Sequence, residues 1–387
     1  MAIPLKYNLR NLAVRRTTTA MTAFSITLTV TVFVVLMALA QGLQVSLTAT
    51  GHPLNLLILR EGSQSETQSS VQRDSLQVIR YLDGIAKTEN GEPWVSPELI
   101  VLINLPRRGQ VQGSNVSIRG LGPEGFAMRP EFKLVEGRQF RPGLREVIVS
   151  KKIADRFQNC GLGEKLKFAK GYWTVVGIFD AGSTAYASEI WTDAEDLGQD
   201  FDRDAYSSVL VRATDATALA RLKKVVSDDR RLHMKPQTEK EYYESQTSTA
   251  APIKALGIFI AGLMAVGASF AAMNTMYAAV ARRTKEIGVL RVVGFSRRSI
   301  LLSFIIESVL IAALGGFIGC VLALPVNGVT TGTTNFMTFS ELTFDFRITL
   351  GLLVNGMIFA VVMGFVGGLF PAWRAAHEDI VTALRSA

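Results

Sequence analysis

Four long stretches of this chain contain no Asp, Glu, Lys or Arg. They run between Arg16 and Arg60, from Ala255 to Ala281, from Ser308 to Ser340 and from Ile348 to Trp373. An α-helix needs about 20 apolar residues to cross roughly 30 Å of hydrocarbon, and each stretch is longer than that. A soluble core does not require four such runs, so the pattern predicts a membrane protein. We expect transmembrane helices at 20–45, 255–281, 300–325 and 349–372.

Charge divides the rest of the chain. Residues 46–252 hold equal numbers of basic and acidic side chains, so the net charge of +8 belongs to the membrane segments and their connections. A nucleic-acid-binding protein would carry its basic surplus on a soluble domain. The distribution therefore argues against nucleic acid as a partner and indicates a lipid bilayer instead.

The basic residues also predict the orientation of the chain, because segments rich in Lys and Arg stay in the cytoplasm. They gather before the first span, between the second and third spans, and after the fourth: Lys6, Arg10, Arg15, Arg16, Arg282, Arg283, Lys285, Arg291, Arg297, Arg298 and Arg374. We expect a multi-pass inner-membrane protein with both termini, the 282–299 segment and the 373–387 tail in the cytoplasm. Residues 46–252 then form a periplasmic domain, and 326–348 an outer loop.

An alternative for the first span is a cleaved signal peptide. Ala38-Leu39-Ala40 resembles a signal-peptidase site after a basic start and an apolar run. The apolar run is longer than the hydrophobic region of most signal peptides. Cleavage would also remove the N-terminal anchor of the 46–252 domain, so we expect the first span to be retained.

The 46–252 block has the texture of an α+β domain, which we expect to consist of two small subdomains. Helical spacing predicts a helix at 216–228. Short apolar runs rich in β-branched residues predict strands at 99–105, 116–121, 145–150 and 173–180.

Catalytic chemistry finds no support in this block. Cys160 stands alone in it and Cys320 belongs to the third span, so we expect no disulfide. The three histidines, His52, His233 and His377, are too scattered for a metal site. Without a paired-carboxylate or nucleophile motif, the block is expected to bind or dock a partner.

Small residues punctuate the third and fourth spans. Gly315 and Gly319 form one G-x-x-x-G pair, and Gly364 and Gly368 form another. This spacing lets two helix backbones approach closely. Two interpretations stay open: the pairs pack the four helices of one chain together, or one of them provides a dimer face.

Glu307 is the one acidic or basic residue well inside the predicted spans, roughly 10–12 Å from the start of the third at 1.5 Å per residue. An unpaired carboxylate at that depth is costly. Three interpretations stay open. Glu307 transmits movement or pairs with Arg282 or Arg298, it is tolerated at a wet interface, or it is protonated. A single such group argues against a proton-coupled transporter.

The segment 282–299 has the pattern of a short amphipathic helix. Ile287, Leu290 and Val293 recur at helical spacing, and charged residues occupy the other positions. The helix dipole favours Glu286 near its start. Such helices lie on lipid headgroups or insert into a groove of a partner protein. The short flanks that join this segment to both neighbouring spans favour the second interpretation.

Two motifs resemble those of a known family. The stretch "RRTKEIGVLRVVGFSRRSILLSFIIESVLIAALGGFIG" at 282–319 is similar to the hallmark of the MacB/FtsX-like ABC transporter permeases, which typically show R-x-x-E-I-G-x-L-[RK]-A-x-G. The ending "FPAWRAAHEDIVTALR" at 370–385 resembles the family's P-A-x-x-A-x-x-x-x-P-x-x-A-L-R motif, with Ile380 in place of the second proline. Residues 144–180 resemble its extracytoplasmic core. The stretch "LRNLAVRRTTTAMTAFSITLTV" at 9–30 resembles its amphipathic entry helix, which we expect in the cytoplasm at 1–19.

The resemblance implies a membrane α-helical permease of four transmembrane helices, with a large α+β extracytoplasmic domain between helices 1 and 2. It also implies a second permease copy, as a homodimer or related heterodimer. Segment 282–299 would be a coupling helix that contacts separate cytoplasmic ABC ATPase subunits through Glu286, Gly288, Leu290, Arg291 and Gly294. ATP and Mg would bind those subunits, because this sequence contains no Gly-Lys dipeptide of a Walker A loop.

Two outputs stay open. The expected one is efflux or extrusion of a lipid, lipoprotein, peptide or drug by mechanotransmission, with a periplasmic adaptor protein as a further partner. The alternative is a signalling permease that activates a periplasmic cell-wall hydrolase and moves no substrate. An intramembrane enzyme would need clustered polar residues in the spans, and the sequence has none there.

Overall fold

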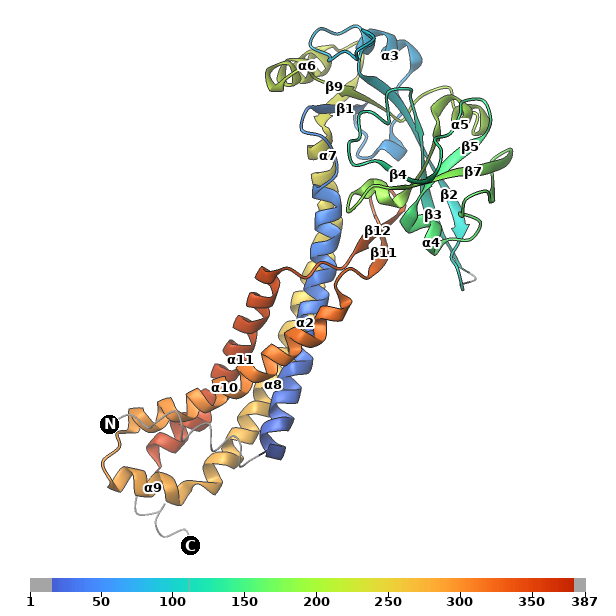
Figure 1. The fold of residues 1–387 in the computed structure, drawn as a ribbon. Helices are drawn as coiled ribbons and strands as arrows, with labels where there is room; N and C mark the ends of the chain where they lie inside the picture. Colours follow the sequence, from blue (N-terminus) through green and yellow to red (C-terminus); the bar gives the residue numbers. More distant parts are fainter. Residues whose placement is uncertain (1–15, 111, 379–387) are drawn as a thin grey trace. The chain divides into compact units, whose positions relative to one another are not determined.

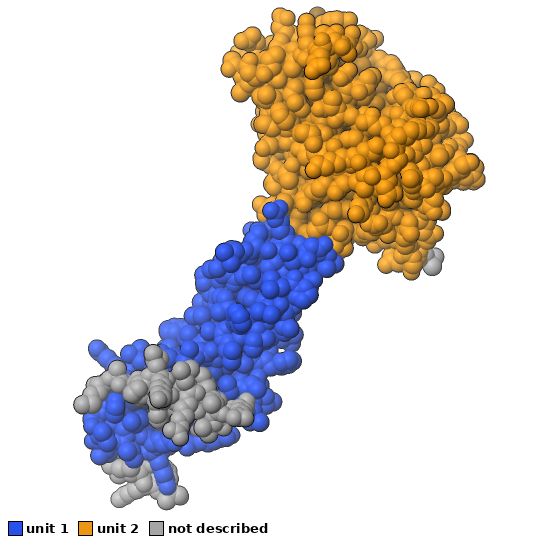
Figure 2. Space-filling model, viewed as in Figure 1, with its two compact units in different colours: residues 1–41, 252–329, 346–387 blue, residues 42–251, 330–345 orange. Residues whose placement is uncertain are grey.

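The computed structural model describes residues 16–110 and 112–378, which belong to two compact units (Figures 1 and 2). The helical unit comprises Met1–Gln41, Pro252–Val329 and Phe346–Ala387. The second unit, which we call the inserted domain, comprises Gly42–Ala251 and Thr330–Asp345. The fold class expected from the sequence is confirmed: four long apolar helices, with a large α+β domain between the first and the second.

Among the described residues, four helices are long and apolar enough to cross a membrane, and each overlaps one predicted span. They are α2 (Arg16–Thr48), α8 (Ala250–Arg282), α10 (Arg297–Ala323) and α11 (Leu350–His377). Side-chain caps define two of their starts, because the Ser296 hydroxyl accepts the Ser299 N–H and the Thr349 hydroxyl accepts the Leu352 N–H. Most of the predicted 1–19 helix, and the C-terminal motif from Asp379 onward, lie outside the described residues.

Both G-x-x-x-G pairs lie at contacts between helices of one chain. A Cβ atom at Gly315 or Gly319 would lie 2.7 Å from a carbonyl oxygen of α2. The Thr27 hydroxyl of α2 donates to the Gly315 carbonyl at 2.9 Å. On the other side of α10, Gly364 and Gly368 of α11 approach Ser308. The four glycines therefore let α10 pack closely against both α2 and α11.

One sheet of ten strands forms the frame of the inserted domain. Its order is β10-β1-β9-β2-β3-β8-β5-β7-β4, with β6 paired to β7. The strands are β1 (Asn55–Arg60), β2 (Val95–Pro106), β3 (Gly113–Leu121), β4 (Lys133–Gly137), β5 (Glu146–Ser150), β6 (Lys165–Phe168), β7 (Gly171–Asp180), β8 (Glu189–Asp193), β9 (Ser208–Arg212) and β10 (Met234–Thr238). The four predicted strands fall on β2, β3, β5 and β7.

The two expected subdomains correspond to two hydrophobic cores that share this sheet. One core gathers α3 (Arg73–Arg80) and α6 (Ala216–Asp228) on β1 and β9. The other gathers α4 (Lys151–Arg156) and α5 (Ala194–Asp200) on β3, β5 and β7. Strand β2 joins them, because its first half pairs with β9 and its second half with β3. The two cores are therefore parts of one continuous sheet.

Shorter elements complete the chain. The inserted domain also contains η1 (Glu66–Gln68), η2 (Ala185–Ser188), α7 (Glu239–Ser245) and η3 (Gln246–Thr249), and the helical unit contains η4 (Leu324–Val326) and α9 (Thr284–Val292). The predicted outer loop at 326–348 contains a hairpin of β11 (Thr330–Thr334) and β12 (Glu341–Asp345). This hairpin is part of the inserted domain. The sequence concealed it because the residues of β11 are polar or Gly and lack the alternation that marks a strand.

The glycine contacts generate a prediction with opposite signs at two positions. Gly319→Ala should lower the thermal unfolding midpoint in detergent, because its new methyl group would overlap α2, at a cost of about 1–3 kcal/mol for overpacking. Gly267→Ala should raise the thermal unfolding midpoint. Gly267 lies on α8, and no atom lies within 4 Å of the new Cβ. Ala is more favourable than Gly in a helix by about 0.8–1.0 kcal/mol. Equal shifts for both variants would contradict the packing described.

Candidate functional site

The predicted coupling segment forms helix α9 and the turn after it. Arg283 alone separates α9 from the end of α8. The Arg283 N–H donates to the Val280 carbonyl, and the Ile287 N–H donates to the Arg283 carbonyl, each at 2.9 Å. Backbone hydrogen bonds therefore continue through the junction, and α9 is held as a bonded continuation of α8.

Gly294 ends α9. Its φ of +105° lies in the left-handed region, which favours glycine. The Phe295 N–H donates to the Leu290 carbonyl at 3.0 Å, and the Gly294 N–H donates to the Arg291 carbonyl at 3.2 Å. These two bonds form a Schellman motif, which satisfies the last carbonyl groups of the helix. Gly294 thus has a structural role that its place in the family motif did not reveal.

The other predicted coupling residues differ in exposure. Gly288 is buried, Leu290 and Arg291 are half-buried, and Glu286 is exposed. Within the apolar stripe expected from the sequence, Ile287 is buried against the bundle, whereas Val293 points outward. The exposed apolar surface of the segment comes instead from Val289, Val292 and Val293, which are 53%, 63% and 67% exposed.

This valine surface is flanked by cations. Four exposed cations are Arg282 before α9, Lys285 in its first turn, and Arg297 and Arg298 after it. Sequence periodicity missed two of the three valines, because Val289 and Val292 lie off the stripe that includes Ile287. Three apolar side chains beside exposed cations are a combination suited to an amphipathic groove with an acidic rim.

Glu307 pairs with Arg283, and not with Arg282 or Arg298 as one interpretation of the sequence suggested. The Arg283 Nη1 lies 2.8 Å from Glu307 Oε2, and both side chains are buried. The guanidinium carbon also lies 6.0 Å from the ring centroid of Phe304. The pair ties the α8–α9 junction to α10. Because Arg282 and Arg283 are neighbours in sequence, only the rotation of the chain at the turn decides which one points inward.

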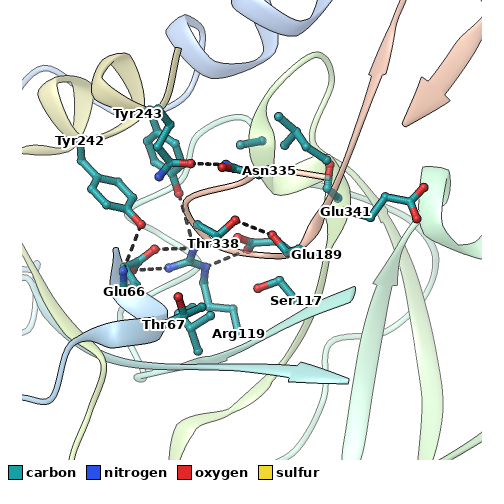
Figure 3. Close-up of a pocket in the computed structure, with 16 residues that line it drawn as sticks. Glu66, Thr67, Ser117, Arg119, Glu189, Tyr242, Tyr243, Asn335, Thr338 and Glu341 are labelled. Carbon is teal, nitrogen blue, oxygen red and sulfur yellow. Dashed lines mark hydrogen bonds and ion pairs between the residues drawn. The ribbon is translucent and has the colours of Figure 1, made fainter. Parts of the chain in front are cut away.

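A second group of buried charges lies in the inserted domain and centres on Arg119 of β3 (Figure 3). Its guanidinium contacts Glu66 at 2.9 Å, Glu98 at 2.6 Å and Glu189 at 2.7 Å. Arg129 lies 2.7 Å from Glu98 as well. The cluster therefore holds η1 against three neighbouring strands, β2, β3 and β8. The sequence did not reveal it, because its members are far apart along the chain.

The pKa shifts in this cluster favour the charged forms. Burial alone would raise the pKa of Glu66, but the charge of Arg119 and hydrogen bonds from Arg119 and Ser208 lower it below its ordinary value. Burial likewise acts to lower the pKa of Arg129, and attraction to Glu98 raises it above its ordinary value. The charges are therefore kept by their partners and not by solvent.

A small cavity of about 40 Å³ lies beside the cluster. Arg119, Glu189 and Tyr243 line it, together with Asn335 and Glu341 of the β11–β12 hairpin (Figure 3). This volume holds a water molecule or two and excludes an organic ligand. Within residues 16–110 and 112–378, no group of three His, Cys, Asp or Glu side chains is placed to hold a metal ion. The Arg119 cluster and its cavity therefore have the geometry of a structural contact between elements and not of a ligand site.

Comparison with known proteins covers nearly the whole described chain. Residues 19–228 match the model of a MacB-like periplasmic core domain, and residues 258–380 match that of an FtsX-like permease C-terminal domain. The "Macrolide export ATP-binding/permease protein MacB 1" of Aeromonas hydrophila is 28% identical, over 80% of this chain and 49% of its own length. The "Pyoverdine export ATP-binding/permease protein PvdT" of Pseudomonas fluorescens is 26% identical, over 86% of this chain and 54% of its own length.

The chain thus spans about half the length of the curated relatives it matches. Among solved structures, the periplasmic region of MacB from Actinobacillus actinomycetemcomitans aligns at 13% identity over 50% of this chain and 92% of that chain, with a TM-score of 0.37.

The Arg119 cluster generates a prediction on pH. Since the folded-state pKa of Glu66 is lowered, its contribution to stability is present above its unfolded pKa of about 4.3 and is lost as pH falls further. Ser208→Ala removes a 2.7 Å hydrogen bond to this carboxylate and should destabilise the domain by about 1.5–3 kcal/mol at pH 7. Thermal unfolding, followed by tryptophan fluorescence, should show that Ser208→Ala destabilises the domain less at pH 3.5 than at pH 7.

Thr192→Val is the matched control for this measurement. The buried Thr192 hydroxyl donates to the carbonyl oxygen of Glu146 at 2.7 Å, a group that does not titrate. Its loss should therefore destabilise the domain by the same amount at both pH values. If the loss of stability caused by Ser208→Ala is also the same at both pH values, Ser208 does not stabilise the charged form of Glu66.

Proposed function

This chain belongs to the permease family defined by a MacB-like periplasmic core domain and an FtsX-like permease domain, and we propose that it is the membrane subunit of an ABC-type complex. ATP and Mg²⁺ bind separate cytoplasmic ATPase subunits, and the four spans carry the resulting movement to the inserted domain. Both termini and α9 lie in the cytoplasm, and the inserted domain lies in the periplasm.

The observation that carries this proposal is the construction of α9. Its exposed valines and flanking cations offer a docking surface for a partner protein. Its backbone is bonded to α8 on one side, and its first turn is tied to α10 through Arg283 and Glu307 on the other. A partner that moves α9 would therefore move two spans together. An anchor on lipid headgroups would not require these attachments.

The ion pair is the transmitting contact at this end of the molecule. A buried charge that loses its partner is costly, by about 3–5 kcal/mol, so Arg283 and Glu307 stay together while α9 moves. This role corresponds to the interpretation of the sequence in which Glu307 transmits movement.

We propose export as the output, since relatives at 26–28% identity carry names that include macrolide export and pyoverdine export. The cargo class is a drug, peptide, lipid or lipoprotein delivered on the periplasmic side. A second permease copy and a periplasmic adaptor complete the assembly. Recovery of a cell-wall hydrolase with the inserted domain, in place of an adaptor, would contradict export and favour the signalling alternative.

The docking surface is tested by changing one valine. Val292→Asp should weaken the association with the cognate ATPase at least about tenfold. It removes one apolar contact that the bound ATPase would bury, and it places an unpaired charge in that contact. A loss of about 1.4 kcal/mol is enough for a tenfold change. Charge reversal at Glu286 or Arg291 should likewise abolish association or transport without affecting membrane insertion. The measurement is co-purification with ABC ATPases co-expressed from the same genome.

Val225→Asp is the control for the docking test. Val225 is also an exposed valine on a helix, but it belongs to α6 of the inserted domain. This variant should retain the ATPase fully. Equal ATPase recovery with Val292→Asp and Val225→Asp, together with undiminished transport, would refute the assignment of α9 as the docking helix.

The ion pair is tested by removing one charge and then exchanging both. Glu307→Gln should leave Arg283 buried without its partner and abolish stimulation of the ATPase by the permease, while the Arg283→Glu, Glu307→Arg exchange should recover part of it. Glu195→Gln, which breaks the exposed pair with Arg73, is the control. It should change the free energy of unfolding by no more than about 0–1 kcal/mol, the effect typical of surface pairs, and it should leave ATPase stimulation unchanged. Undiminished stimulation with Glu307→Gln would exclude the transmitting role.

A further inference from the structure

The β11–β12 hairpin lies between the third and fourth spans in sequence, yet it is part of the inserted domain. The chain therefore passes between the helical unit and the inserted domain at four places: near residues 41, 251, 329 and 345. Two of these crossings lead to α2 and α8, and the other two lead to α10 and α11. What holds the hairpin to the domain decides whether the last two crossings transmit any movement.

Glu341, at the start of β12, is the centre of the attachment. Its side chain is 0% exposed. Arg107, which follows β2, contacts Oε2 through Nη2 at 2.7 Å and through Nε at 3.1 Å. Arg156, at the end of α4, places Nη2 2.7 Å from Oε1. One carboxylate from the hairpin thus bridges two guanidinium groups from two different parts of the domain.

The facing strand of the hairpin is shaped for this contact. Gly332 of β11 has no side chain, and a Cβ atom there would collide with Glu341 Oε1 and lie 2.9 Å from Arg156 Nη2. The glycine therefore provides the space in which the three charged groups meet. A glycine within a strand often marks such a close approach.

Contacts along the rest of the hairpin fix its register on the domain. The Thr343 N–H donates to the Ser188 hydroxyl at 2.7 Å, and Lys152 Nζ lies 2.7 Å from Asp345 Oδ2. At the tip, the Asn335 amide donates to Gln246 Oε1 at 2.7 Å. Leu342 and Phe344 are both buried. The hairpin is therefore packed and bonded to the domain along its whole length.

The links from the hairpin to the spans are short. Residues 346–349 join β12 to α11, and a fully extended chain of four residues reaches only about 14 Å. The Phe346 N–H donates to the Val329 carbonyl at 3.0 Å, and the Ile348 N–H donates to Asn327 Oδ1 at 2.8 Å, so the two links are bonded to each other. Such links have little slack with which to absorb a displacement.

From these contacts we propose that the 330–345 hairpin is a strap through which α10 and α11 pull on the inserted domain, and that Glu341 is the positioning residue that keeps the strap attached. The inference rests on the proposed function, because it assumes an ATP-driven movement of the spans. It adds a second route for that movement, besides the direct continuation of the chain from α2 and α8.

The test compares hydrogen exchange of the full chain with its ATPase, in nanodiscs, with and without a non-hydrolysable ATP analogue and Mg²⁺. In the unaltered protein we expect nucleotide-dependent changes both in α9 and in the inserted domain. Glu341→Gln leaves Arg107 and Arg156 facing each other without their anion, so the hairpin amides should exchange faster. The nucleotide response should then be lost in the inserted domain and kept in α9.

A disulfide provides the rescue. Ser188 Oγ and Thr343 Oγ1 lie 2.9 Å apart, so Ser188→Cys with Thr343→Cys should re-attach the hairpin in the Glu341→Gln background after oxidation, with both native cysteines replaced by Ala. The response of the inserted domain should return on oxidation and disappear on reduction. Asp229→Asn, which breaks the ion pair between half-buried Asp229 and exposed Arg231, is the control and should leave the response unchanged.

Three results would overturn the strap. The first is a response of the inserted domain that survives in Glu341→Gln although the hairpin amides exchange faster. The second is hairpin exchange unaltered by Glu341→Gln, which refutes the role of Glu341. The third is a response that the oxidised disulfide fails to restore. If the unaltered protein shows no nucleotide response in α9, the proposed function fails together with the strap, and this outcome is distinct from the other three.

Discussion

A buried carboxylate that is paired with a guanidinium cannot exchange this partner for water, so the pair fixes the elements that carry the two groups against each other. This chain uses that constraint at three positions: Arg283 with Glu307, Arg119 with its three glutamates, and Glu341 with two arginines. Each joins different secondary-structure elements. Separating such a pair leaves an uncompensated buried charge, which costs about 3–5 kcal/mol, so each contact behaves as a stiff joint.

Stiff joints suit a protein whose proposed task is to transmit movement. The helices of the helical unit pack through glycines that bring backbones together, and close packing deforms little. The inserted domain is likewise one continuous sheet with two cores, joined by the twelve residues of β2. Under the proposed function, a displacement of α9 by the ATPase would therefore reach the inserted domain with little deformation of the elements between them.

The sequence predicted the spans well because an apolar run without charges has few alternatives to a membrane helix. It predicted strands where β-branched residues cluster, as in β2 and β7, and missed β11, whose polar residues carry no alternation. At the candidate site it pointed to α9 through a family motif. It could not show that Gly294 caps the helix, that Val289 and Val292 are exposed, or that Arg283 pairs with Glu307, since each depends on how the chain turns between α8 and α10.

Two sequence motifs carried the resemblance to the family, while composition and spacing alone predicted four apolar helices and the length of the insertion between the first two. These properties follow from hydrophobicity and local propensity, which act over a few neighbouring residues. Only the tertiary structure decided which charges meet and that a loop between two spans joins a distant domain. Ion pairs form between residues such as Arg107 and Glu341, separated by more than two hundred positions, and no local pattern encodes which of many arginines a buried carboxylate will meet.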